Sequence, residues 1–124
     1  CRAQGRRIEA NAQLRQRRAE FDDFRGRIDL EVRSAFLDVQ AAAQQIEAAR
    51  TAVVLADQEL TQARDRFAAG VASNIEVTSA QQSVAAASES YIVALYSHNV
   101  AKASLARAVG VAEETVAAFL TGAQ

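Results

Sequence analysis

Two long repeating patterns of apolar residues flank the stretch Arg66-Phe67-Ala68-Ala69-Gly70-Val71-Ala72-Ser73-Asn74-Ile75-Glu76-Val77. Gly70 suits the left-handed backbone conformation that ends many helices, because glycine has no Cβ atom to oppose it. Ser73 and Glu76 then have the spacing of a capping box, in which the serine caps a new helix and the glutamate reaches back to it. The stretch therefore predicts that one helix stops, that a second starts within a few residues, and that the two are antiparallel neighbours.

The two flanking patterns have a period of seven residues. In each, one position carries a larger side chain and the position three residues later carries alanine. The first pattern consists of Val32, Val39, Ile46, Val53, Leu60 and Phe67 with Ala35, Ala42, Ala49, Ala56 and Ala63. The second consists of Val77, Val84, Tyr91, His98 and Leu105 with Ala80, Ala87, Ala94, Ala101 and Ala108. Heptads sustained in this way predict two helices that pack along one seam as a coiled coil.

The resulting prediction is an all-α fold, a long antiparallel α-helical hairpin. We expect helix one over about residues 6–69 and helix two over about residues 74–109. Gly110 is interpreted as the end of helix two, and Glu113-Glu114 as acids at the start of a further helix. That short C-terminal helix is expected over about residues 112–121, ending at Thr121-Gly122.

Helix one is predicted to be much longer than helix two. Residues 1–31 would then form an overhanging half of helix one, residues 32–110 the paired hairpin with its tip at 70–73, and residues 111–124 a separate continuation. An exposed apolar stripe is expected on the overhang, and such stripes usually mark an interface. The stripe consists of Leu14, Phe21, Phe24 and Ile28. We therefore expect the isolated chain to self-associate as a dimer or bundle.

Composition and motifs argue against catalysis. The sequence has no proline and only five glycines, which disfavours a fold with many turns. It has one cysteine and one histidine, which disfavours a disulfide framework or a zinc site within one chain. We see no phosphate-binding loop and no nucleophile motif, so we expect no enzyme, no cofactor and no metal. His98 is interpreted as a packed seam residue, and Cys1 as a fragment boundary rather than the lipid-bearing cysteine of a lipoprotein.

The turn resembles the signature of TolC-like outer-membrane efflux channels. That signature has an Arg-aromatic pair, a turn glycine, a Ser or Thr, and an acid followed by valine, which correspond here to Arg66-Phe67, Gly70, Ser73 and Glu76-Val77. The resemblance covers nearly the whole chain and is most specific over residues 64–110. It continues at Ala80-Gln81, Tyr91, Ala94, Tyr96, Asn99, Ala101, Leu105 and Ala108-Val109-Gly110, and upstream at Val32-Arg33, Ala35-Phe36-Leu37-Asp38, Ala56 and Leu60.

This resemblance implies that the chain is the periplasmic helical part of the second repeat of such a channel, with residues 111–124 at the start of the equatorial region. The channels are trimers in the outer membrane of Gram-negative bacteria. They are exit ducts for solutes expelled by an inner-membrane pump, which a periplasmic adaptor protein connects to the channel. Glu76 matches an acid that lines the closed periplasmic aperture. The tip residues that match the adaptor-docking surface are Ala69, Gly70, Val71, Ala72 and Ser73.

The tip departs from the family pattern at three positions. Phe67 stands where a tyrosine can donate a hydrogen bond, Ala72 where an arginine can bridge helices, and Ser79 where a second acid can sit. The residues also leave open an alternative function, a stand-alone helical-hairpin scaffold that recruits another coiled coil without any transport role. The turn signature and the unequal lengths of the two predicted helices favour the channel segment over the scaffold.

Overall fold

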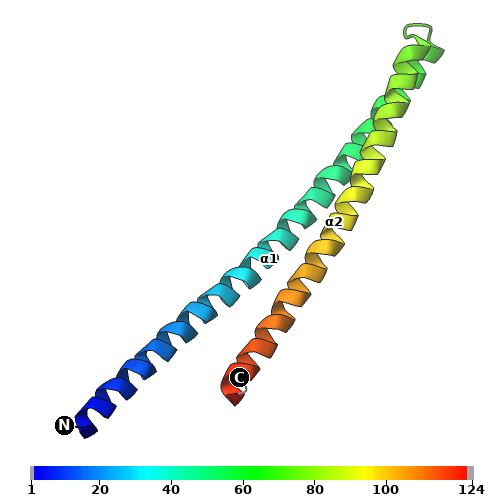
Figure 1. Ribbon diagram of the computed structural model, residues 1–124. Coiled ribbons are helices and arrows are strands. Elements are labelled where there is room, and N and C mark those ends of the chain that lie inside the picture. The colour runs from blue at the N-terminus through cyan, green and yellow to red at the C-terminus, as the bar shows by residue number, and fades with distance from the viewer. Residues whose placement is uncertain (1, 123–124) are drawn as a thin grey trace.

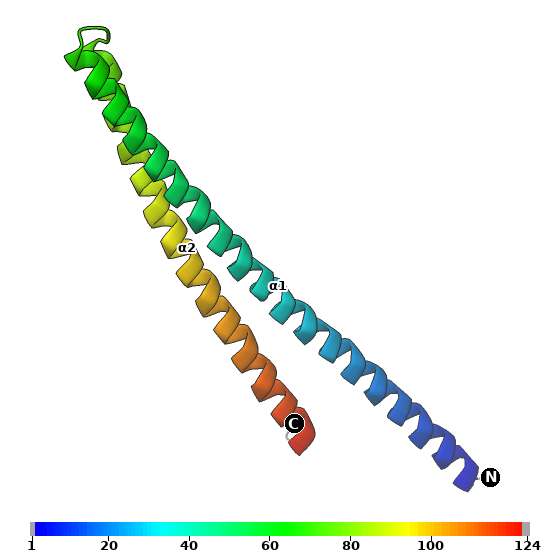
Figure 2. The same ribbon diagram turned by 180° about the vertical axis from the view of Figure 1, so that it is seen from behind.

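The computed structural model describes residues 2–122 as two long helices joined by a tight turn. Helix α1 spans Arg2–Ala68 and helix α2 spans Asn74–Thr121. The two helices are antiparallel, lie close together at the turn and diverge toward the other end (Figure 1). The view from behind shows the same arrangement of the two helices (Figure 2). The predicted all-α antiparallel hairpin is confirmed, while Cys1 lies outside the described residues.

The seam between the helices is built from the predicted heptad positions. Its buried side chains are Ile46, Ala49, Ala56, Leu60, Ala63 and Ala94. Ile46, Ala49 and Ala94 form one cluster, and Tyr91 packs against that cluster. Alanine at alternate seam positions lets the two backbones approach closely, although each alanine buries little area. The core is therefore a narrow line along the hairpin, and its stability depends on contacts along the full length of the seam.

Helix α1 continues for 67 residues without interruption, which corresponds to about 100 Å at 1.5 Å per residue. It begins at Arg2, four residues before the predicted start. The sequence contains no proline to break it. Gly5 and Gly26 lie inside the helix, where each costs only about 1 kcal/mol relative to alanine. A glycine with this small cost does not interrupt a helix when the residues on either side of it are good helix formers.

The predicted end of helix two at Gly110 is wrong. Helix α2 passes through Gly110 and ends at Thr121, so the separate helix expected over residues 112–121 is the last part of α2. The heptad pattern explains this result, because Ala112 and Phe119 follow Leu105 at the same seven-residue interval. Continued packing along the seam offsets the modest cost of one interior glycine.

The stop predicted at Thr121-Gly122 for the short C-terminal helix is the end of α2. Gly122 has a φ of 65°, in the left-handed region, and its N–H group donates a hydrogen bond of 3.4 Å to the carbonyl oxygen of Phe119. Glycine adopts this conformation without the steric cost that other residues carry.

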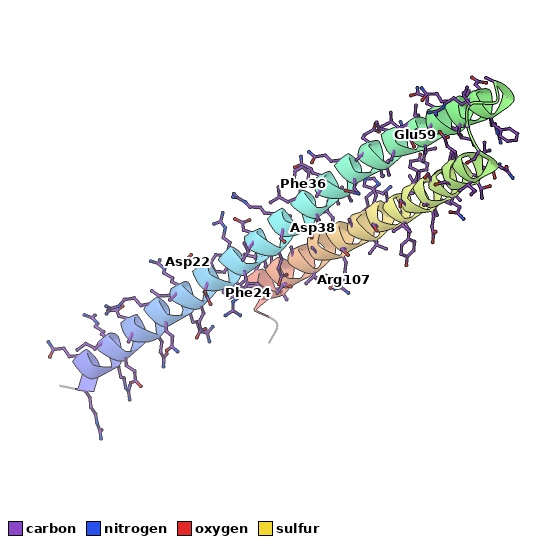
Figure 3. The ribbon with its side chains drawn as sticks, turned by 90° about the horizontal axis from the view of Figure 1, so that it is seen from above. Asp22, Phe24, Phe36, Asp38, Glu59 and Arg107 are labelled. Atoms are coloured by element: carbon purple, nitrogen blue, oxygen red, sulfur yellow. The ribbon has the colours of Figure 1, made fainter. Side chains whose placement is uncertain are left out.

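The overhang of α1 is shorter than the predicted residues 1–31. Phe21, Phe24 and Ile28 are half-buried, and the ring centroids of Phe21 and Phe119 lie 4.7 Å apart. Figure 3 places Phe24 beside the C-terminal end of α2. Because α2 reaches these residues, the overhang lies within the exposed residues before Phe21, and even there Leu14 and Arg17 line one surface depression together with Phe119. Within residues 2–122, no helix has an apolar stretch long enough to cross a membrane.

Candidate docking surface at the hairpin tip

A hydrogen-bonded turn of the Schellman type forms the tip. Gly70 has a φ of 75°, and its N–H group donates a 3.0 Å hydrogen bond to the carbonyl oxygen of Phe67. The N–H group of Val71 donates a second 3.0 Å hydrogen bond to the carbonyl oxygen of Arg66. These bonds pair carbonyl groups that the end of α1 would otherwise leave without partners. The predicted role of Gly70 as the left-handed stop of the first helix is confirmed.

Helix α2 begins without the predicted capping box. Ser73 is the N-cap residue and has an extended backbone, but its side chain makes no capping hydrogen bond. Its carbonyl oxygen accepts a 3.1 Å hydrogen bond from the N–H group of Glu76. The carboxylate of Glu76 lies 3.4 Å from the guanidinium of Arg66, across the turn. The predicted capping role of Glu76 is therefore wrong, because this carboxylate pairs with Arg66 of the preceding helix and not with the backbone of its own N-cap.

The turn gathers the five predicted docking residues at one end of the molecule. Ala69, Gly70, Val71 and Ser73 are exposed, and Ala72 is half-buried. They are contiguous, and a well-defined backbone conformation presents them. Their binding of a partner stays a prediction.

Two further apolar side chains extend this surface. Phe67 is 50% exposed and Ile75 is 80% exposed, on either side of Val71, which is 67% exposed. The heptad pattern predicts Phe67 in the seam, but Phe67 lies in the last turn of α1, at the end of the seam, and remains half exposed. Ile75 falls outside the heptad pattern, so sequence reasoning misses it. The signal that could find it is its position as a large apolar residue in the first turn of α2, off the seam.

A groove runs back from the tip between the two helices. Its floor includes the small side chains of Ala63 and Ala80, and its charged side chains come from Glu59, Arg66 and Glu76. Figure 3 shows Glu59 on α1 near the tip. The remaining lining residues are Gln62, Ser73, Ile75, Ser79 and Ser83. The groove is polar, in contrast to the apolar end of the hairpin that adjoins it.

The aromatic and basic side chains in the middle of the hairpin have structural roles. Tyr91 and His98 are half-buried at seam positions, as expected for packed residues. The hydroxyl group of Tyr91 and the carboxylate of Glu47 raise the pKa of the Arg50 guanidinium. The guanidinium of Arg50 lies 3.5 Å from the carboxylate of Glu47 on the same helix. The contact between Arg50 and Tyr91 joins α1 to α2 away from the tip.

Comparison with known proteins places this hairpin in a family. The model of the family described as outer membrane efflux protein matches residues 2–111, which includes all of α1, the tip and most of α2. No curated protein and no solved structure matches the chain significantly. Because the family match extends over far more than half of the sequence, the chain belongs to the outer membrane efflux protein family.

Proposed function

We propose that the chain is a periplasmic coiled-coil segment of a trimeric outer-membrane efflux or secretion channel. In this proposal the hairpin tip docks a periplasmic adaptor protein in a tripartite export system, and an inner-membrane pump acts through that adaptor. Membership of the outer membrane efflux protein family supports the channel assignment. The observation that carries the docking assignment is the blunt tip, where exposed Val71 and Ile75 adjoin Gly70.

The tip has the properties of a protein-binding surface. Large apolar side chains that stay exposed on a rigid element are typical anchors for a partner. A Cβ atom built on Gly70 would meet nothing within 4 Å, so the space in front of this backbone is open within the chain. A partner can therefore approach the backbone at Gly70 closely. The backbone hydrogen bonds from the N–H groups of Gly70 and Val71 to the last turn of α1 hold the turn in this conformation.

The outer faces of the two helices support assembly with further helices. Large apolar side chains remain exposed on both helices away from the seam. They include Leu30, Leu37, Val54, Leu55, Ile92, Val93, Tyr96 and Val100. Apolar side chains in such numbers usually pack against other protein. We propose that they pack against neighbouring hairpins of the same channel, in the periplasm of a Gram-negative bacterium, with residues 111–124 at the start of the equatorial region.

Glu76 is proposed to line the narrow periplasmic aperture of the assembled channel. It lies within the first turn of α2, directly behind the tip, and its side chain is 41% exposed. Acidic side chains arranged in a ring favour cations over anions in a narrow pore. No cofactor and no catalytic step are part of this proposal.

The docking assignment can be tested by capture of the purified adaptor. Gly70→Asp places a charged side chain where the partner would meet the backbone, and aspartate tolerates the left-handed conformation better than most residues. We expect this variant to lose adaptor binding and to keep nearly unchanged helix content by circular dichroism. Gly26→Asp, on the exposed surface of α1, is the matched control and should bind as the parent does. Unchanged capture by Gly70→Asp would contradict the tip assignment and favour a scaffold without a transport role.

A further inference from the structure

One ion pair joins the two ends of the turn. Arg66 is in the last turn of α1 and Glu76 is in the first turn of α2. Their guanidinium and carboxylate groups lie 3.4 Å apart, with side chains that are 58% and 41% exposed. The pair thus connects groups that are ten positions apart in sequence and belong to different helices.

The backbone of the turn holds both partners in place. The carbonyl oxygen of Arg66 accepts the hydrogen bond from the N–H group of Val71, and the N–H group of Glu76 donates to the carbonyl oxygen of Ser73. A cation near the C-terminus of α1 and an anion near the N-terminus of α2 also interact favourably with the two helix dipoles. The positions of the two charges are therefore set by the fold of the tip.

Arg64, the second arginine near the turn, lies outside the groove that contains Arg66 and Glu76. Arg64 lines a different surface depression together with Asp57. Within that groove the charges are those of Glu59, Arg66 and Glu76, which sum to one negative charge. Arg66 is therefore the positive charge that faces Glu76 from α1, and Arg64 provides a matched control.

We infer that Arg66 neutralises Glu76 within each hairpin and so determines the ion selectivity of the aperture. This inference rests on the proposed function, in which Glu76 lines that aperture. A cation beside a carboxylate converts an isolated charge into a dipole, whose field falls more steeply with distance. The paired cation weakens the field of the carboxylate most in a narrow pore, because little water is present there to screen the charges. A ring of paired Glu76 residues attracts permeating cations more weakly than a ring of unpaired ones.

The test is the reversal potential of the complete channel in a planar lipid bilayer under a potassium chloride gradient. It gives the cation-to-anion permeability ratio. We expect Arg66→Gln to raise this ratio by about twofold or more, since it leaves Glu76 unpaired in the pore. Arg66→Lys, which keeps the positive charge, should stay near the parent ratio. Glu76→Gln should lower the ratio, and the Arg66→Gln, Glu76→Gln double variant should not exceed the parent.

The outcomes separate this inference from the proposed function. Arg64→Gln should leave the ratio unchanged, because Arg64 lies outside the groove. If Glu76→Gln lowers the ratio but Arg66→Gln leaves it unchanged, Glu76 lines the aperture and the inference about Arg66 is wrong. If neither substitution changes the ratio, the aperture assignment of Glu76 is itself wrong. If Arg64→Gln and Arg66→Gln raise the permeability ratio equally, the inference is also wrong, because that result would show a general effect of removing positive charge.

Discussion

The aromatic rings of Phe21 and Phe119 lie with their centroids 4.7 Å apart and their planes tilted by 36°. This contact joins α1 to the last turn of α2, at the end of the hairpin opposite the tip. The helices diverge toward this end (Figure 1), and alanine side chains cannot fill the wider space between them. Two phenylalanine side chains can do so, and their contact lies two residues before the end of α2.

Phe119→Ala should loosen this end of the hairpin. Offset or tilted aromatic pairs contribute roughly 0.5–1.5 kcal/mol beyond their buried area, so we expect the free energy of unfolding to fall by about 1 kcal/mol. Hydrogen exchange of the backbone amides near the end of α2 should become faster, while amides near Ala56 keep their protection. Leu120→Ala is the control, because Leu120 is 76% exposed and its removal should change stability little. Equal effects of the two substitutions would show that the aromatic contact contributes nothing specific.

Substitution of glycine by alanine should change the free energy of unfolding in one direction at the turn and in the other inside the helices. Gly70→Ala should lower the free energy of unfolding by about 1–2 kcal/mol, because its φ of 75° is unfavourable for a residue with a Cβ atom. Gly26→Ala and Gly110→Ala should each raise it by up to about 1 kcal/mol, since both glycines lie inside helices. An added Cβ atom meets nothing within 4 Å at either position. Urea denaturation measures all three changes, and a loss of stability in Gly110→Ala would contradict a continuous α2.

The alanine seam should not accept a larger side chain. Ala56 is 6% exposed, and Ala56→Leu should lower the free energy of unfolding by about 1–3 kcal/mol through overpacking. Ala52 is exposed on the same helix, so Ala52→Leu should change stability by less than about 0.5 kcal/mol. Thermal unfolding followed by circular dichroism compares the two variants. If Ala56→Leu is tolerated as well as Ala52→Leu, the helices do not pack closely at position 56.

The isolated chain should self-associate. Residues 2–20 are exposed throughout and include Leu14, and the outer faces of both helices carry further exposed apolar side chains. Sedimentation equilibrium should therefore show a dimer or a larger assembly that weakens in Leu14→Glu. Gln13→Glu adds a negative charge at the neighbouring exposed position and should have less effect. A well-folded monomer at high protein concentration would contradict this prediction.

The hairpin and its seam could be predicted because their signals are local or periodic. A glycine at a helix stop and alanine at every seventh position each have one simple structural consequence. The extension of α2 is also present in the pattern, as Ala112 and Phe119, but Gly110 resembles a stop signal and obscures it. Inside a packed helix a single glycine costs too little to act as one.

The detailed contacts of the tip could not be predicted in the same way. The carboxylate of Glu76 has two possible partners, the start of its own helix and Arg66 across the turn. The choice between them depends on the path of the turn in three dimensions, which sequence spacing does not specify. Ile75 escapes prediction for a related reason, because exposed residues beyond the end of a seam follow no period.

Contact between the hairpin tip and the adaptor can be detected by site-specific photocrosslinking in cells. A photoreactive amino acid is placed at Val71 or, in a separate variant, at Leu55 on the exposed surface of α1 in the middle of the hairpin. We expect Val71 to form an adduct with the adaptor and Leu55 to form adducts with other chains of the channel. Adaptor adducts at Leu55 together with none at Val71 would contradict docking at the tip.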